Sequence, residues 1–178
     1  MESVPPRLYG GTERVVSHLC EALVQEGHDV TLFASGDSVT SARLVACTKV
    51  AIRLNDAIQD HVPHYMIMLD KLHRSSHLFD ILHFHIDAYH MPLFREVGAK
   101  TLTTLHGRQD LLDLLPLYRA FPDMPLVSVS NAHRQPIAEA NFAKTVYHGL
   151  PLDLLPPTYE ARGGYLAFSG AHFSRKTT

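Results

Sequence analysis

The stretch Pro5-Pro6-Arg7-Leu8-Tyr9-Gly10-Gly11-Thr12-Glu13-Arg14 places two glycines directly before a predicted helix. Glycine lets a ligand approach the backbone without a β-carbon in the way, and the first turn of a helix presents unpaired N–H groups to an anion. Thr12 is the expected N-cap of this helix, and Glu13 suits the positive end of the helix dipole. Because the spacing is neither GxGxxG nor that of a Walker loop, an ordinary glycine-rich helix start is the alternative interpretation.

The rest of the chain alternates between helical and strand patterns, as chains that form parallel α/β sheets do. Helices are predicted over residues 12–26, 62–76, 91–97 and 110–121. The last of these carries Pro116, which predicts a break or kink, and a further helix begins at Ser130 or Asn131. In the second helix the predicted core face consists of Tyr65, Met66, Leu69 and Leu72. Strands are predicted over residues 29–34, 43–47, 80–84, 101–105, 126–129 and 143–147.

The composition agrees with one compact domain, since 178 residues with 46% hydrophobic and 19% charged side chains suffice for one core of ordinary size. The formal net charge is -2, so the broad basic face of a nucleic-acid binder is not expected. No apolar run reaches membrane-spanning length, and no signal peptide is recognised. Neither Cys20 nor Cys47 belongs to a CxxC motif, which predicts reduced thiols in a cytoplasmic protein.

Two stretches of sequence resemble the start of the amino-terminal domain of family 4 glycosyltransferases: Leu8-Tyr9-Gly10-Gly11-Thr12-Glu13-Arg14-Val15-Val16 and Gly27-His28-Asp29-Val30-Thr31-Leu32-Phe33-Ala34. Further short stretches follow in that family's order over nearly the whole chain: Phe79-Asp80-Ile81-Leu82-His83-Phe84-His85, Thr104-Leu105-His106-Gly107, Val129-Ser130 and Val146-Tyr147-His148-Gly149-Leu150. Family 4 enzymes have the GT-B fold, in which two Rossmann-like domains face each other across a cleft. The resemblance therefore implies an α/β fold, a Rossmann-like parallel sheet with helices on both faces that forms one half of a GT-B enzyme.

The resemblance also implies where the domains lie. Residues 1–157 correspond to the amino-terminal, acceptor-side domain, and residues 158–178 to the end of the linker and a first-strand remnant of the donor domain, with that strand at 165–169. Pro151, Pro156 and Pro157 fit the linker. By this comparison the chain is truncated at both ends, because the family has a hydrophobic strand before the Pro5 stretch and an E-x7-E motif in its second domain.

Two expectations follow from this truncation. The family's first strand is central in its sheet, so neighbouring strands would lack partners unless the gene starts upstream of Met1, or another strand or a partner chain completes the sheet, self-association included. At the other end, Ala171-His172-Phe173-Ser174-Arg175-Lys176 stands where the family continues Arg-Ile-Ser-Pro-Glu-Lys, as one inserted base after Gly170 would produce. We expect a tail that was never selected to pack, and a fragment that does not transfer sugar alone.

The activity that the resemblance implies is transfer of a sugar from a nucleotide-sugar to a hydroxyl acceptor, which is a sugar, a lipid or a small molecule. The family retains the anomeric configuration and needs no metal or other cofactor. Backbone N–H groups at Gly10 and Gly11 would approach the donor phosphates, because fixed donors must face the leaving diphosphate. The donor sugar, its nucleotide and the acceptor are not specified by these residues.

Four side chains at predicted strand ends are candidates for the site. His106 matches the family's histidine that reaches the transferred sugar and is the predicted catalytic residue, with a turn-capping histidine as the structural alternative. His85, Asp87 and Ser130 are predicted acceptor-cleft residues. Gly11 and His106 are expected in one cleft, because parallel sheets bind ligands at the C-terminal ends of their strands.

Two other functions remain open at this point. His83, His85, Asp87 and His90 approach the HxHxDH run of zinc-dependent hydrolases, although His90 stands out of register with that motif. A non-enzymatic sugar-binding or interaction module built from the same domain is the other alternative, because the features that would exclude it belong to the family's second domain.

Overall fold

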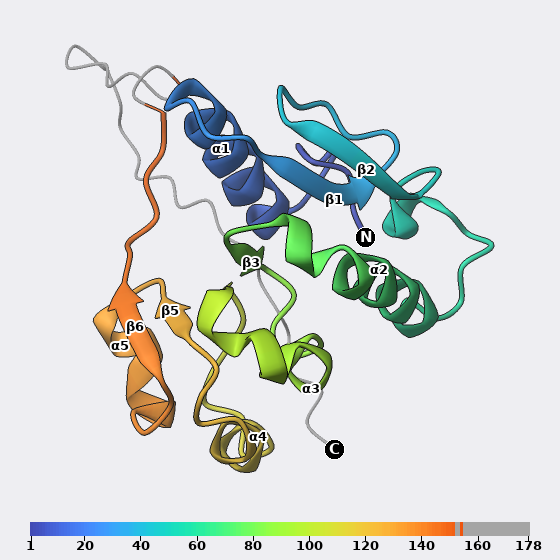
Figure 1. The fold of residues 1–178 in the computed structure, drawn as a ribbon. Helices are drawn as coiled ribbons and strands as arrows, with labels where there is room; N and C mark the ends of the chain where they lie inside the picture. Colours follow the sequence, from blue (N-terminus) through green and yellow to red (C-terminus); the bar gives the residue numbers. More distant parts are fainter. Residues whose placement is uncertain (152–153, 155–178) are drawn as a thin grey trace, which may run out of the picture.

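The computed structural model describes residues 1–151 and 154, and Figure 1 shows their helices and strands in order along the chain. The α-helices are α1 (Gly11–Gln25), α2 (Val62–Arg74), α3 (Met91–Phe94), α4 (Leu114–Ala120) and α5 (Asn131–Arg134). The strands are β1 (Thr31–Ser35), β2 (Arg43–Thr48), β3 (Leu82–Phe84), β4 (Thr101–Thr104), β5 (Leu126–Ser128) and β6 (Phe142–Thr145). Short 3-10 helices are η1 (Ile52–Leu54), η2 (Ser76–Leu78), η3 (Arg95–Lys100) and η4 (Gln135–Ile137). The predicted domain at 158–178, its strand at 165–169 and the tail from Ala171 lie outside the described residues.

The strands form two parallel sheets, one of β1 and β2 and the other in the order β3-β4-β5-β6. Parallel neighbours require a crossover connection, and helical segments supply it: α3 and η3 between β3 and β4, α4 between β4 and β5, and α5 and η4 between β5 and β6. The predicted α/β fold with parallel strands is therefore confirmed. The C-terminal ends of β3, β4 and β5 consequently share one edge.

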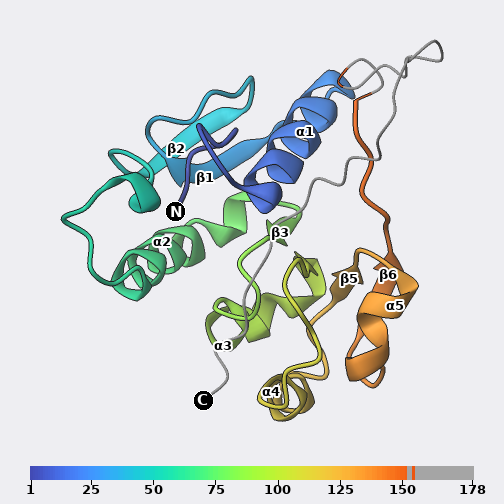
Figure 2. The ribbon, with the colours of Figure 1, turned by 180° about the vertical axis from the view of Figure 1, so that it is seen from behind.

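Helices cover both faces of the sheet formed by β1 and β2, because successive side chains of a strand point to opposite faces. Leu32 and Ala34 are buried on one face in a cluster with Cys20 of α1. Phe33 packs instead against the main core, to which α2 contributes Leu69. Figures 1 and 2 show α1 and α2 on different sides of this sheet, which agrees with the predicted helices on both faces.

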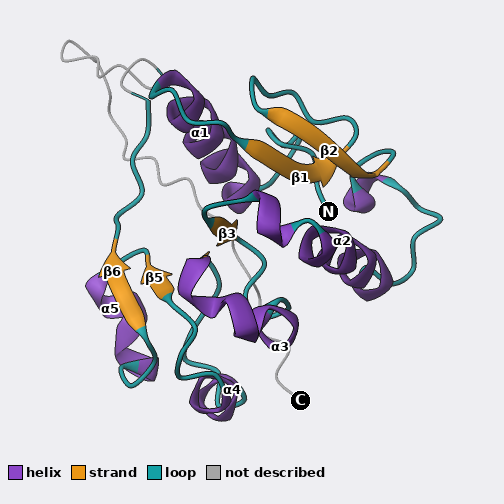
Figure 3. Ribbon diagram, in the orientation of Figure 1, coloured by secondary structure: helices purple, strands orange, loops and turns teal. Residues whose placement is uncertain are grey.

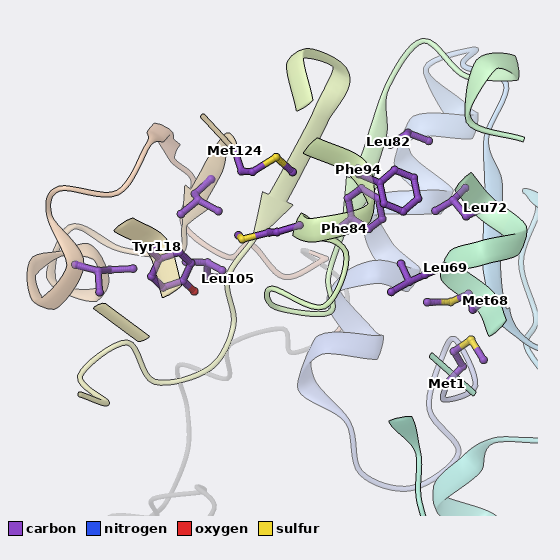
Figure 4. Packing of buried hydrophobic residues seen from close by; sticks show 13 residues of the cluster. Met1, Met68, Leu69, Leu72, Leu82, Phe84, Phe94, Leu105, Tyr118 and Met124 are labelled. Carbon is purple, nitrogen blue, oxygen red and sulfur yellow. The ribbon is translucent and has the colours of Figure 1, made fainter. Parts of the chain in front are cut away.

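The main core lies among α2, β3, α3 and the strands that follow (Figure 4). Its buried members are Met1, Met68, Leu69, Leu72, Leu82, Phe84, Met91, Phe94, Leu105, Tyr118, Met124, Leu126 and Ile137. Each fully buried leucine- or phenylalanine-sized side chain stabilises the fold by about 1.5–3 kcal/mol. This cluster therefore holds the second sheet and its covering helices together as one unit.

The prediction for the core face of α2 is correct for three side chains and wrong for one. Leu69 and Leu72 are buried and Tyr65 packs against the main core, whereas Met66 is 66% exposed and Met68 is 5% exposed. Residues three, four and seven positions apart share one face of a helix, so 65, 68, 69 and 72 form a stripe. Position 66 lies about 100° away from position 65 around the helix axis.

The parallel sheet is interrupted between β1 and β3, which are not hydrogen-bonded to each other in the described part of the chain (Figure 3). Residues 1–9 form no strand there, as expected. The carbonyls of Met1, Glu2 and Val4 instead accept backbone hydrogen bonds from Ile52, Ser35 and Val39, respectively. The first residues thus tie the ends of neighbouring segments together without forming a ladder. Completion of the sheet by another strand or by self-association stays a prediction.

Two local predictions are wrong. Thr12 is not the N-cap of α1, because the helix begins at Gly11 and is capped by Gly10 without a side-chain hydrogen bond. Pro116 does not kink a long helix, because α4 begins only at Leu114 and the proline occupies its first turn. Proline is tolerated there since the first N–H groups of a helix have no intrahelical partner. No helix in the described residues is long and apolar enough to cross a membrane.

Candidate functional site

A cavity of about 300 Å³ lies where the start of α1, the start of α2 and the loop after β3 meet. Three separate parts of the chain therefore build it, and two of them carry residues singled out from the sequence. Its lining consists of Thr12, Glu13, His61, Tyr65, His85, Ile86, Asp87 and Tyr89. The cavity stands at the C-terminal end of β3, the sheet edge at which parallel folds bind ligands.

The glycine-rich loop makes a close approach to the first turn of α1. A β-carbon at Gly10 would collide with the Glu13 carboxylate and come within 3.0 Å of the Pro6 Cβ, whereas the space around Gly11 is open. Arg53 of η1 secures this arrangement, since its guanidinium donates to the Tyr9 carbonyl at 2.6 Å and to Glu13 Oε1 at 3.2 Å. The Glu13 carboxylate thus sits at the positive end of α1, where the sequence predicts a phosphate.

Three aromatic rings form one wall of the cavity. Tyr65 of α2 and Tyr89 of the loop after β3 are stacked, with ring centroids 5.5 Å apart and an interplanar angle of 13°. His61 stands edge-on to both rings, at 5.7 Å from Tyr65 and 6.4 Å from Tyr89. Its Nε2 is 3.5 Å from the Tyr89 hydroxyl. Because each ring is held by the other two, the wall is preformed rather than assembled by a ligand.

His85 and Asp87 follow β3 and face the cavity together. Asp87 adopts a φ of 51°, in the left-handed region that Asp tolerates better than most residues. Its Oδ1 lies 3.9 Å from the place of a β-carbon on Gly107, so it reaches toward the loop after β4. Burial raises the pKa of Asp87, and the nearby His133 opposes that change.

His106, at the end of β4, hydrogen-bonds to His85 across the sheet edge, with Nε2 of His106 2.9 Å from Nδ1 of His85. His106 also stacks on His148, with ring centroids 5.4 Å apart. Burial and the neighbouring histidines lower the pKa of both His85 and His106, so the two rings are neutral at neutral pH. In a neutral pair one ring donates the shared proton and the other accepts it, which couples the two tautomers.

The loop that follows His106 is held from two sides. The Gly107 carbonyl lies 2.7 Å from His133 Nε2 and accepts a hydrogen bond from Gln109 Nε2 at 3.0 Å. Gln109 is itself buried and accepts a hydrogen bond from the Tyr118 hydroxyl at 3.0 Å. These contacts fix the backbone next to His106 and thereby the position of its ring.

The four candidate zinc ligands do not converge. His83 and His85 lie side by side, with ring centroids 4.2 Å apart, but His83 Nε2 hydrogen-bonds to Thr104 Oγ1 at 2.8 Å. His90 is fully buried on the other side of β3, where it stacks on Phe84. Within the described residues no group of three or more His, Cys, Asp or Glu side chains is placed to hold a metal ion. The geometry therefore gives the zinc-hydrolase interpretation no support.

Ser130 is the N-cap of α5 in this fold. Its hydroxyl accepts a hydrogen bond from the His133 backbone N–H at 3.0 Å and caps α5, as one of the two predicted N-caps. It does not line the cavity. The structure thus places Thr12, next to Gly11, in one cavity with His85 and Asp87. Gly11, His106 and Ser130 are not among the lining residues, and His106 is connected to the cavity by its hydrogen bond with His85. The expectation that Gly11 and His106 share one cleft stays a prediction.

Sequence reasoning missed the wall residues His61, Tyr65 and Tyr89 and the positioning residue His133. Tyr65 belongs to the predicted core face of α2 and does pack against the main core, but it lines the cavity as well. Tyr89 stands within the histidine-rich run after β3 and is 49% exposed, which is a large exposed fraction for an aromatic side chain beside a strand end. Only that combination of an aromatic residue and a strand end could have indicated the wall.

The chain also matches a protein-family model. The family model described as Glycosyltransferase Family 4 matches residues 9–153, more than half of the chain. The matched range includes every residue that lines the cavity. A search among curated proteins finds no match.

Proposed function

The chain belongs to glycosyltransferase family 4, and on that premise we propose that its cavity holds the hydroxyl acceptor of a retaining sugar transfer from a nucleotide-sugar. The chain carries the amino-terminal, glycosyltransferase-type domain of this family. The family's GT-B architecture would supply a second Rossmann-like domain for the donor. The reaction class in this proposal is hexosyl transfer, with the nucleotide-sugar as co-substrate.

The observation that carries the proposal is the convergence of the α1 start, His85 and Asp87 on one cavity at the strand ends. Sugar transfer needs two substrates held in line while negative charge gathers on the leaving diphosphate. A preformed cavity with hydroxyl-binding side chains meets the first requirement for the acceptor. The N-terminal end of α1, at Gly10 and Gly11, offers N–H groups for the second.

His106 is proposed to act at the transferred sugar. Its neutral ring can donate or accept one hydrogen bond besides the one to His85. The contacts of His133 and Gln109 with the adjacent Gly107 carbonyl would hold that ring in place as the substrates bind. Neutrality is useful here, because a cationic ring would repel the oxocarbenium-like sugar in the transition state.

We place this reaction in the cytoplasm, on the interpretation of the cysteines as reduced thiols. Both are free, and Cys20 is buried in the cluster beneath α1. Burial raises the pKa of Cys20 to about 11, which keeps it an unreactive thiol.

The domain by itself is proposed not to transfer sugar, because the donor would lack the contacts that the family's second domain provides. The test compares the chain of 178 residues with a two-domain version whose reading frame after Gly170 is restored, each incubated with a panel of nucleotide-sugars and hydroxyl acceptors. Product is expected from the two-domain version alone, with the anomeric configuration of the donor retained.

Comparable turnover by both chains would contradict the proposed inactivity of the single domain. Product with inverted configuration would contradict retention. Absence of product from the two-domain version with every donor would refute the transferase proposal and favour a sugar-binding module instead.

A further inference from the structure

From the charges and rings that line the cavity we infer that the acceptor enters as an uncharged sugar ring, and that acceptors with a phosphate or carboxylate on that ring are excluded. This inference rests on the proposed function, because it specifies the substrate class of the same cavity. It concerns the ring that carries the reacting hydroxyl and leaves the rest of the acceptor free to extend outside.

Charge is the first argument. The lining of the cavity, all of it within the described residues, contains the carboxylates of Glu13 and Asp87 but neither lysine nor arginine. The nearest guanidinium, that of Arg53, is committed to the Tyr9 carbonyl and to Glu13. An anionic substituent placed here would face two acidic side chains without a cation to pair with, in a partly desolvated site where repulsion is poorly screened.

Hydrogen-bonding capacity is the second argument. A sugar hydroxyl both donates and accepts, and it donates best to an ionised carboxylate. Asp87 and Glu13 supply such acceptors from two separate segments, the loop after β3 and the first turn of α1, and Thr12 adds a hydroxyl. His85 uses Nδ1 for its bond to His106, so its other ring nitrogen is the one that can serve a ligand. This combination satisfies several hydroxyls of one ring.

The aromatic wall is the third argument. Tyr65, Tyr89 and His61 hold one another in place and present a rigid surface at the side of the cavity. A sugar ring has an apolar face of C–H groups, and such a face gains by packing on aromatic carbon that would otherwise be wet. A phosphate or carboxylate gains nothing from this wall.

Size limits the ligand further. A volume of about 300 Å³ is at the lower end of the range for small-molecule sites. The cavity is therefore suited to a single ring rather than to an oligosaccharide. The charge, the hydroxyl partners, the wall and the volume converge on one class of ligand, a neutral monosaccharide unit.

The test is a binding titration that needs no turnover. Isotope-labelled protein of all 178 residues is titrated with neutral methyl glycosides of glucose, galactose and mannose, and in parallel with glucose 6-phosphate and glucuronic acid, by two-dimensional NMR. At least one neutral glycoside should shift resonances of Tyr65 and Tyr89 in a saturable way. The two anionic probes should bind at least about tenfold more weakly, since one unfavourable charge contact of modest size suffices for that factor.

Two pairs of variants separate the wall from the charge. Tyr89→Ala should abolish binding of the neutral glycoside, and Tyr147→Ala, at a tyrosine that is 64% exposed and outside the cavity, should not. Asp87→Asn should reduce the difference in affinity (the gap) between the neutral and the anionic probes. Asp70→Asn, at an exposed aspartate paired with Arg74 on α2, is its control and should leave the gap unchanged.

The outcomes are distinct from those of the transfer assay. Binding of glucose 6-phosphate or glucuronic acid as tight as that of the neutral glycosides would overturn the inference while leaving sugar transfer intact. No saturable shift with any probe would overturn the assignment of this cavity to sugar, and the proposed transferase activity would still be judged by its products.

Discussion

The pH dependence of stability tests whether His90 is buried as the structure shows. This residue has no exposed surface and stacks on Phe84 with ring centroids 3.8 Å apart. Burial lowers its pKa from 6.5 to about 4. Because the unfolded chain then binds a proton before the folded chain does, the free energy of unfolding falls as the pH falls from about 6.5 to about 4. This lowering of the His90 pKa corresponds to a contribution of about 3 kcal/mol to the free energy of unfolding. About 2 kcal/mol of that contribution is lost between pH 7 and pH 4.5.

The variant His90→Phe removes the titrating group and keeps a flat ring against Phe84. It also leaves the Thr103 hydroxyl without its ring partner at 2.9 Å, but that cost is the same at both pH values and cancels. Urea unfolding followed by circular dichroism measures the free energy of unfolding. Between pH 7 and pH 4.5 this free energy should fall by about 2 kcal/mol more in the native chain than in the variant. His28→Phe, at an exposed position, controls for the loss of a histidine as such.

Equal losses in the native chain and in His90→Phe would refute the reasoning, because the buried ring would then contribute nothing to the acid sensitivity. If the variant is too unstable for the comparison, NMR titration of the His90 ring in the native chain replaces it. Protonation of that ring near pH 6.5 would refute the reasoning equally.

Three further predictions rest on other parts of the structure. Gly10→Ala should lower the melting temperature, because its β-carbon would collide with a carboxylate, whereas Gly11→Ala meets open space and should be neutral or slightly stabilising. Met68→Ala should cost about 2–5 kcal/mol of unfolding free energy in a denaturant titration, and Met66→Ala, on the exposed side of the same helix, less than about 0.5 kcal/mol. His106→Ala in the two-domain version should lower turnover far more than the melting temperature, and equal loss of both would favour a purely structural histidine.

Much of the fold could be predicted because its signals are local. The alternation of helix and strand, the end of α1 next to Gly27 at a φ of 89° and the cap at Ser130 each depend on neighbouring residues. Met66 and Pro116 were placed wrongly for a different reason. An apolar methionine fits the periodic pattern whether or not a neighbour covers it, and a proline marks a helix start as readily as a kink.

The site was only partly predictable, because its residues meet through tertiary contacts. His85, Asp87 and His106 stand at strand ends, where topology alone directs attention. His61 stands at the start of α2, far along the chain from Tyr89. Only the packing of α2 beside β3 brings the centroids of the two rings to 6.4 Å from each other. Neither the stack nor the resulting wall leaves any periodic trace in the sequence.

The glycine-rich loop shows how a motif can be placed correctly while its electrostatics remain hidden. The helix begins within the glycine pair, at Gly11, and its positive end already faces the Glu13 carboxylate, which is held by Arg53 from 40 positions away. A donor phosphate that approaches these N–H groups meets the Glu13 carboxylate first, so the carboxylate has to move away from the helix start before the phosphate binds. The ion pair at 3.2 Å and the hydrogen bond from Arg53 to the Tyr9 carbonyl hold the guanidinium and the carboxylate in their present places. This arrangement depends on the contact between η1 and α1, so the folded chain reveals it and the motif alone does not.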